Sequence, residues 1–391
     1  LFMQFRRAGF HTVSFSSFAE RHSAWWFNAG FNECFNVGNR GGESAEMVTP
    51  HVLDWLERNG EGDNWMLHVH YWDPHTPYRT PADYESRFQD TPLPDDWITE
   101  DIFKEHLLHI GPHGANEINM WNDDTFKQWP KHPGKLETKE AAKHLIDLYD
   151  DGVRYTDDNI GMILDYLKEK GLYDEDLAII ITADHGEDLG EFGVYGEHGM
   201  ADEPVCRIPM IIKWPGVEGG RHVNGFHDNV DLLPTVQELL GTERFGSYHY
   251  DGVSYAGTLL EGTDCSRPYE VLTQCAHVCQ RSARFDHYVY IRTVHGGYHL
   301  LPDEMEADPH EQHNLAQERP DLCAKGAKLI LDWNDAMMKT SAYDADPMWT
   351  VMREGGPEHC RGHLQAYMER LKGTPREYGI ELLTEKYKGF E

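Results

Sequence analysis

The sequence lacks several features that would assign the protein to a simple class. No run approaches about 18 consecutive apolar residues, so we expect no segment to span a membrane. The start, LFMQFRRAGF, has no initiator Met and no charged, apolar and small-residue regions of a signal peptide. The 7 cysteines are scattered without a CxxC pair, so a disulfide framework is not indicated.

Basic residues are also scarce, at 35 Lys and Arg against 67 Asp and Glu, which gives a net charge of −32. A surface this negative repels phosphate backbones, so we expect no nucleic-acid partner. Hydrophobic residues make up 40% of the 391 residues, which supports a sizeable core and excludes general disorder. The 24 histidines direct attention to metal or proton chemistry.

Hydrophobic patterning predicts an α/β fold. Short apolar strands are expected at 64–71, 177–182 and 209–214, and amphipathic helices at 138–171 and 230–240. Helix, short loop and apolar strand in succession form half of a βαβ unit. We therefore expect a mixed, mostly parallel sheet sandwiched by helices.

The hydrophobic and charge patterns divide the chain into two parts. Residues 1–263 are expected to form the main α/β domain, in which 82–137 is an insertion or a cap carrying Trp97, Trp121 and Trp129. These tryptophans suit stacking against sugar rings, although an ordinary packed insertion would look the same. Residues 264–391 predict a small antiparallel α+β subdomain and a charged, helical tail. Within it, CAHVC (275–279) resembles a strand with buried thiols rather than metal ligands.

Acidic and imidazole groups follow directly after the apolar strand 177–182. Asp184 and His185 stand at its carboxyl end, where open α/β sheets bind ligands, and Gly186 permits close backbone approach. A carboxylate beside an imidazole is a suitable pair of ligands for a divalent cation. The alternative is an Asp that caps the following turn beside a surface His.

A loop bracketed by glycines carries His198 thirteen residues further on, GEHGM. It can fold back over the same strand end, or His198 can be an ordinary exposed loop residue. We interpret the nearby Asp202, Glu203 and Arg207 as an ion-pair cluster that shapes this loop.

Histidines also surround the end of strand 64–71, in HVHYWDPHTPY. His68 and His70 point to one face of the strand, and His75 stands in the turn after it. The spacing permits a zinc site, but buried histidines with satisfied hydrogen bonds are commoner. His75, on a turn stiffened by two prolines, is better placed as a proton donor or anion binder.

Together these segments resemble the sulfatase branch of the alkaline phosphatase superfamily. The resemblance rests on DPHTPY, TADHGEDLGEFGVYGEHG, RIPMIIKWPG, NVDLLPTVQELLG and the late GYHLLPDEMEADPHEQHNLAQERPDL, in this order. It implies a metal-dependent hydrolase of sulfate monoesters that acts on a small molecule or glycan. The tryptophans of 82–137 favour a carbohydrate. It favours a periplasmic or secreted location over a cytoplasmic one; the sequence carries no signal for oligomeric state.

Site residues follow from the same resemblance. It implies that Asp184 and His185 bind the divalent cation, Ca²⁺ in the first place with Mn²⁺ as the alternative. His75 would bind a sulfate oxygen or serve the leaving group. His198 would bind the same sulfate, although relatives commonly have Gly-Lys-His where this chain has Gly-Glu-His. Arg21 and His22 are possible stand-ins for a further substrate-binding motif, or an ordinary surface pair.

The family's nucleophile motif, C/S-x-P/A-x-R, does not occur, and no early strand ends in two metal-binding Asp residues. We expect roughly 80–120 residues that carry both, including the formylglycine nucleophile, to lie outside this chain. Two alternatives remain open. One is a phosphonate or phosphate ester hydrolase of the same superfamily, and the other a non-catalytic anion-binding pseudoenzyme.

Overall fold

The structure, a computed structural model, describes residues 1–94, 97–120, 123–244, 249–294, 296–302, 308–357 and 359–388. Three parallel strands form one sheet in the order β2 (Glu33–Phe35), β1 (His11–Phe15), β3 (Trp65–Val69). The register pairs Phe15 with Val69, so β1 and β3 end at the same edge. The prediction of a strand over 64–71 is confirmed.

A second pair of strands, β4 (Ile179–Thr182) and β7 (Met210–Lys213), is antiparallel. Both strands were predicted, but not their antiparallel pairing. The side chains of β4 are half-buried to exposed, which differs from the fully buried strand that the apolar run indicates. The sheet layer is therefore mixed, with its parallel part in β1–β3.

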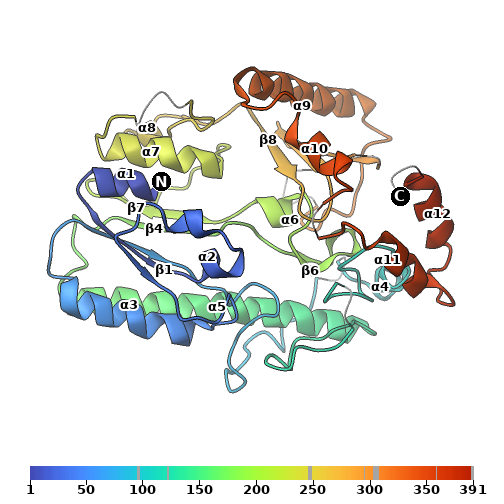
Figure 1. The fold of residues 1–391 in the computed structure, drawn as a ribbon, viewed down its shortest axis with the longest axis horizontal. Coiled ribbons are helices and arrows are strands. Elements are labelled where there is room, and N and C mark those ends of the chain that lie inside the picture. Colours follow the sequence, from blue (N-terminus) through green and yellow to red (C-terminus); the bar gives the residue numbers. More distant parts are fainter. Residues whose placement is uncertain are drawn as a thin grey trace.

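Helices cover both faces of this layer (Figure 1). Helices α3 (Ala45–Asn59) and α5 (Lys139–Glu169) lie on one side, and α1 (Phe2–Arg7), α7 (Leu232–Leu239) and α8 (Ala256–Leu260) lie on the other. Helix α5 begins where expected, because the Thr138 side chain accepts a hydrogen bond from the backbone nitrogen of Ala141. Short connecting elements complete this part: α2 (Phe18–Arg21), η1 (Trp25–Asn28), β5 (Asp188–Leu189), η2 (Glu191–Gly193), β6 (Tyr195–Glu197), α6 (Glu203–Cys206) and η3 (Asn229–Asp231).

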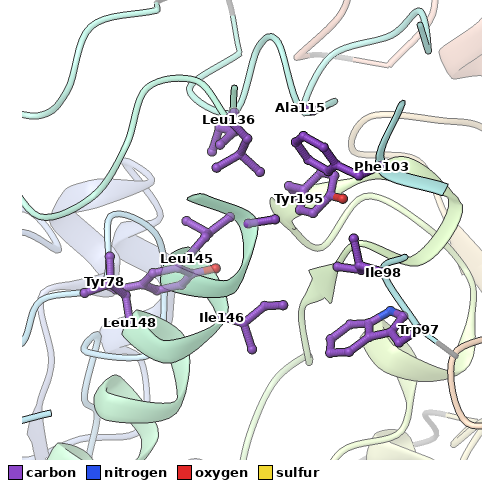
Figure 2. Packing of buried hydrophobic residues seen from close by; sticks show 12 residues of the cluster. Tyr78, Trp97, Ile98, Phe103, Ala115, Leu136, Leu145, Ile146, Leu148 and Tyr195 are labelled. Atoms are coloured by element: carbon purple, nitrogen blue, oxygen red, sulfur yellow. The ribbon is translucent and has the colours of Figure 1, made fainter. Parts of the chain in front are cut away.

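Segment 82–137 contributes to the core. Its helix α4 (Glu100–His106) and the loop after it pack on the start of α5, where Ile98 and Phe103 meet Leu145 and Tyr195 (Figure 2). Trp97 is buried and stacks on His310 with ring centroids 3.9 Å apart, so it offers no free face to a sugar. Trp129 is half-buried, and Trp121 lies outside the described residues.

The C-terminal part contains an antiparallel sheet, as predicted. Its order is β11 (Tyr298–Pro302), β10 (Tyr288–Thr293), β9 (Gln280–Phe285), β8 (Tyr269–Gln274). Helix α9 (Pro320–Thr340) packs on it through a core that includes Phe285, Leu300 and Ile330. The tail is helical: α10 (Pro347–Arg353), α11 (Leu364–Leu371) and α12 (Gly379–Lys386).

One expectation about this part is wrong. Residues 275–279 are not a strand but the loop that joins β8 to β9, which places His277 at its tip. In the part of the chain that the structure describes, no helix combines the length and apolar character needed to cross a bilayer.

Candidate active site

Three histidines from different segments meet beside the sheet layer. His75 follows β3, His185 follows β4 and His198 follows β6. The ring centroids lie 6.0 Å apart for His75 and His185, 5.2 Å for His75 and His198, and 3.8 Å for His185 and His198. One ring nitrogen from each lies within 4.8 Å of the other two. The structure thus brings together the residues that the sequence singled out.

A close backbone approach fixes the tip of β4. The Gly186 nitrogen donates a 2.7 Å hydrogen bond to the carbonyl of Val205, at the end of the returning loop. A Cβ atom at Gly186 would stand 1.9 Å from the carbonyl oxygen of Pro204. Only glycine fits, and this contact holds the Asp184–His185 pair against the loop that carries His198.

Asp184 and His185 present ligands suited to a divalent cation. The Nδ1 of His185 lies 2.8 Å from the carbonyl oxygen of Gly186. Because a carbonyl only accepts, Nδ1 carries the hydrogen and Nε2 keeps its lone pair. That Nε2 lies 3.7 Å from Oδ1 of Asp184, whose side chain is 71% exposed. An imidazole oriented by its other nitrogen, beside an open carboxylate, is the arrangement that metal-binding histidines adopt.

The turn after β3 holds His75 firmly. Its Nδ1 lies 2.6 Å from the carbonyl oxygen of Thr76, so Nε2 carries the lone pair here as well. The buried Arg79 donates from Nη1 to the carbonyls of Trp72, at 2.9 Å, and His75, at 2.6 Å. Desolvation, with the charges of Arg79 and His198, lowers the pKa of His75 well below its usual value. His75 is therefore a neutral imidazole that accepts through Nε2.

Two neighbouring elements anchor the same turn. The Asp73 carboxylate accepts a 2.9 Å hydrogen bond from the backbone nitrogen of Ala45, at the start of α3. On the other side, a Cβ atom at Gly152 of α5 would stand 2.8 Å from the carbonyl oxygen of Asp73. The sequence DPH is thus clamped between the two longest helices of the main domain.

His198 is not the exposed loop residue of the alternative interpretation. Its Nδ1 lies 3.1 Å from a carboxylate oxygen of Glu197 and 3.7 Å from one of Glu187, which also accepts a 2.9 Å hydrogen bond from the hydroxyl of Tyr78. Desolvation lowers the pKa of His198, but the two carboxylates outweigh it and the pKa is raised. The carboxylates therefore favour the cationic form of His198.

Arg21 and His22 lie at the rim of this cluster rather than on a separate surface. The guanidinium carbon of Arg21 is 5.0 Å from the ring centroid of Trp72, and the His22 ring stacks on the same indole at 6.2 Å. Desolvation and the charge of Arg21 lower the pKa of His22, against the opposing effect of the Asp184 carboxylate. Both side chains are within electrostatic reach of the strand tip.

The zinc interpretation of His68, His70 and His75 is not supported. The Nδ1 of His68 bonds the hydroxyl of Ser14 at 3.0 Å, and that of His70 bonds Ser16 at 2.9 Å. Among the described residues, His75 groups instead with His185 and His198. His68 and His70 are half-buried structural histidines with hydroxyl partners.

The interpretation of Asp202, Glu203 and Arg207 needs a correction. The guanidinium that neutralises the cluster belongs to Arg284 of β9, which pairs with Glu203 and donates at 2.9 Å to the carbonyl of Asp202. Arg207 is exposed. The sequence could not show this, because the partner lies about 80 residues away and is brought in by the C-terminal sheet.

Sequence reasoning also missed Glu187 and Glu197. Both are buried acids beside His198. They lie in segments where the sequence predicted functional roles for other residues. The available signal was the acidic residue directly before His198, in Gly196-Glu197-His198.

The fold, with this cluster at the strand tips, is of the alkaline-phosphatase type. The model of the Sulfatase family matches residues 2–242, which is more than half of the chain. The chain belongs to the sulfatase family.

Individual relatives agree with this. The chain is 27% identical over 295 residues to PehA of Trinickia caryophylli, a multifunctional alkaline phosphatase superfamily protein, covering 70% of this chain and 55% of PehA. It is 37% identical over 246 residues to the N-acetylglucosamine-6-O-sulfatase of Bacteroides thetaiotaomicron, covering 52% of this chain and 44% of that protein. The chain thus spans about half the length of these curated relatives.

A solved structure confirms the fold. The phosphonate monoester hydrolase of Silicibacter pomeroyi superposes with a TM-score of 0.64 at 21% identity, covering 87% of this chain and 80% of that one. The predicted alkaline-phosphatase-like α/β architecture with a C-terminal antiparallel sheet is confirmed.

Proposed function

We propose that the complete protein hydrolyses a sulfate monoester of a carbohydrate, with Asp184 and His185 as two ligands of a divalent cation. The observation that carries this proposal is the meeting of His75, His185 and His198 beside Asp184, from three separate segments. Ca²⁺ is the proposed metal and Mn²⁺ the alternative. A periplasmic or secreted location stays a prediction.

The donor set suits such a cation. Asp184 offers a carboxylate oxygen and His185 an imidazole nitrogen whose lone pair is free. When bound, the cation supplies positive charge that offsets the repulsion between an anionic ester and its attacker. On a protein with a net charge of −32, an anionic substrate needs a local concentration of positive charge.

His198 and His75 have different proposed roles. His198, with two carboxylates at its Nδ1, is the cationic partner for a sulfate oxygen and the proton donor to the leaving alcohol. His75 accepts through Nε2 and contacts the substrate from the opposite segment. Arg21 and His22, at the rim, are proposed substrate contacts.

The nucleophile is proposed to be a formylglycine contributed by residues outside this chain, together with the remaining metal ligands. Support comes from family membership and from the share of the relatives' length that the chain spans. The carbohydrate assignment is supported by the similarity to an N-acetylglucosamine-6-O-sulfatase.

A second candidate is phosphonate or phosphate ester hydrolysis. The specific observation in its favour is the similarity to PehA, whose name describes it as multifunctional, over 70% of this chain. Both reactions require an anionic tetrahedral centre held by a cation and imidazoles, so the cluster alone does not separate them.

The test uses the complete natural protein and compares rates on an aryl sulfate, a sulfated N-acetylglucosamine and an aryl phosphonate monoester. We expect the sulfate esters to react fastest and His198→Ala, which removes the proposed proton donor, to lower kcat/KM by about 10²–10⁴. His144→Ala, an exposed change on α5, is the control and should have no effect. A higher rate on the phosphonate supports the second candidate. If the complete protein turns over none of these substrates, the result would support the alternative of a non-catalytic, anion-binding pseudoenzyme.

A further inference from the structure

A second group of potential ligands lies beside the first, and family membership does not assign it a role. His113 comes from segment 82–137, Glu197 from the end of β6, and His277 from the β8–β9 loop. One ligand atom from each lies within 4.8 Å of the others. All three residues are buried, with exposed fractions of 7%, 6% and 7%.

The hydrogen bonding of His113 leaves a lone pair directed at a negative group. Its Nδ1 lies 2.9 Å from the carbonyl oxygen of Ile118, so Nδ1 carries the hydrogen of the neutral ring. Its Nε2 lies 3.2 Å from a carboxylate oxygen of Glu197, yet has no aligned hydrogen-bond partner among the described residues. A lone pair facing a carboxylate is repulsive unless a cation lies between them.

His277 approaches the same carboxylate from the opposite side. Its Nε2 lies 2.8 Å from Nδ1 of His359, which orients the ring. Its Nδ1 lies 3.4 Å from the other carboxylate oxygen of Glu197 and is buried without an aligned partner in the described chain. Two imidazole nitrogens, each oriented through its second nitrogen, thus converge on one buried carboxylate. This is how proteins orient histidine ligands of metals.

The separations fit a transition metal. Ligand atoms about 2.0–2.2 Å from a tetrahedral ion lie roughly 3.3–3.6 Å from one another. His113 Nε2 lies 3.2 Å from one carboxylate oxygen of Glu197 and His277 Nδ1 lies 3.4 Å from the other, so each nitrogen is close to this distance from a carboxylate oxygen. Two imidazoles and one carboxylate form a ligand set that zinc accepts, whereas Ca²⁺ prefers an all-oxygen set.

We propose that His113, Glu197 and His277 form a second, buried metal site for a zinc-class divalent cation. The ion would link segment 82–137, the loop that carries His198 and the C-terminal sheet. These parts already meet there: Gln274 Nε2 donates at 2.9 Å to the carbonyl of His198, and a Cβ atom at Gly199 would stand 3.0 Å from the Cβ of His277. The role of the ion is structural, and the proposal does not depend on hydrolysis.

The test measures metal directly. The purified protein carrying His185→Ala, which removes one ligand of the first cluster, is stripped with a chelator and titrated with Zn²⁺ and with Co²⁺. We expect a single equivalent of Zn²⁺ by elemental analysis and the visible absorption of tetrahedral Co²⁺. Adding His113→Ala or His277→Ala should abolish both signals. The control is His106→Ala, which removes a similarly buried ring whose Nδ1 lies 2.7 Å from the hydroxyl of Tyr195.

A variant that fails to fold would not decide the question, so Glu197→Gln provides a second comparison. It keeps the shape of the side chain and removes the charge, and we expect at least a tenfold weaker affinity for Zn²⁺. Added Zn²⁺ should raise the Tm of the stripped His185→Ala protein but not that of Glu197→Gln in the same background. Equal Zn²⁺ content and affinity in folded His113→Ala, His277→Ala and His106→Ala would overturn the proposal and leave the proposed hydrolysis untouched.

Discussion

The rings of His185 and His198 stack 3.8 Å apart with an angle of 17° between their planes. Two protonated imidazoles at this distance would repel each other, so the stack favours one neutral and one cationic ring. His185 keeps a lone pair on Nε2, while His198 faces the carboxylates of Glu187 and Glu197. Within a single contact, the stack therefore places the proposed metal ligand, His185, beside the proposed cationic residue, His198.

Replacing His198 tests the cationic role. In the complete protein, His198→Ala should lower kcat/KM by about 10²–10⁴, because the substrate's anionic oxygen loses a charged donor. His198→Lys should recover part of the rate, since an ammonium also suits the carboxylate partners. Steady-state kinetics on the preferred ester measures both. Equal losses in the two variants would show that the ring, rather than its charge, is what matters.

The fold could be predicted from the sequence wherever local patterns carry it. The amphipathic stripe of α5, capped by Thr138, and the apolar runs of β3, β4 and β7 are visible in the order of residues. The pairing of β4 with β7 was not visible, because strand direction depends on how distant segments return. Local pattern identifies an element, and only tertiary packing fixes its partner.

The same division applies to the candidate site. His75, Asp184 and His185 follow strand ends, where ligands bind, so their proximity could be inferred. Glu187 and Glu197, the carboxylate partners of His198, are close to it in the sequence, but the sequence does not show that they face its ring. The position of His277 could not be inferred, because the β8–β9 loop brings it to Glu197 from about 80 residues further along the chain.

Gly186 provides a test of how the metal ligands are positioned. Gly186→Ala would place a Cβ atom 1.9 Å from the carbonyl oxygen of Pro204, so β4 and the returning loop must separate. We expect weaker binding of Ca²⁺ or Mn²⁺ at Asp184 and His185, measured by isothermal titration. Gly171→Ala serves as control, since nothing lies within 4 Å of the added carbon, although its φ of +70° makes some loss of stability expected. Unchanged affinity in Gly186→Ala would contradict this account of the strand tip.

Arg284 is the buried cation that stabilises the junction with the C-terminal sheet. It is 4% exposed, pairs with Glu203, and lies among the buried acids Asp188, Asp202 and Glu311. Arg284→Met should reduce the free energy of unfolding by about 3–5 kcal/mol, because Glu203 is left without its partner. Urea denaturation measures the loss.

The matched control for that change is Arg319→Met. Arg319 pairs with Asp321 at 2.8 Å on the surface, where water screens the two charges, so Arg319→Met should hardly change the free energy of unfolding. Adding Glu203→Gln to Arg284→Met should restore part of the stability, because it removes the unpaired charge. If Arg284→Met and Arg319→Met cost the same, the junction does not depend on this ion pair.

His68 makes stability sensitive to acid. Burial lowers its pKa from 6.5 to about 3, with a further contribution from His70, so the ring stays neutral in the folded protein. Below pH 6.5 the unfolded chain binds a proton that the folded protein does not, and stability falls as the pH decreases towards 3. The loss of stability from this residue grows with each pH unit within that window. His68→Gln, whose amide can still bond the hydroxyl of Ser14, should be less sensitive to acid.

Urea denaturation at pH 7 and pH 4.5 should therefore show a smaller difference in the free energy of unfolding for this variant than for the natural protein. The exposed His51→Gln on α3 should keep the full difference. An unchanged difference in His68→Gln would mean that other groups determine the acid sensitivity of the fold.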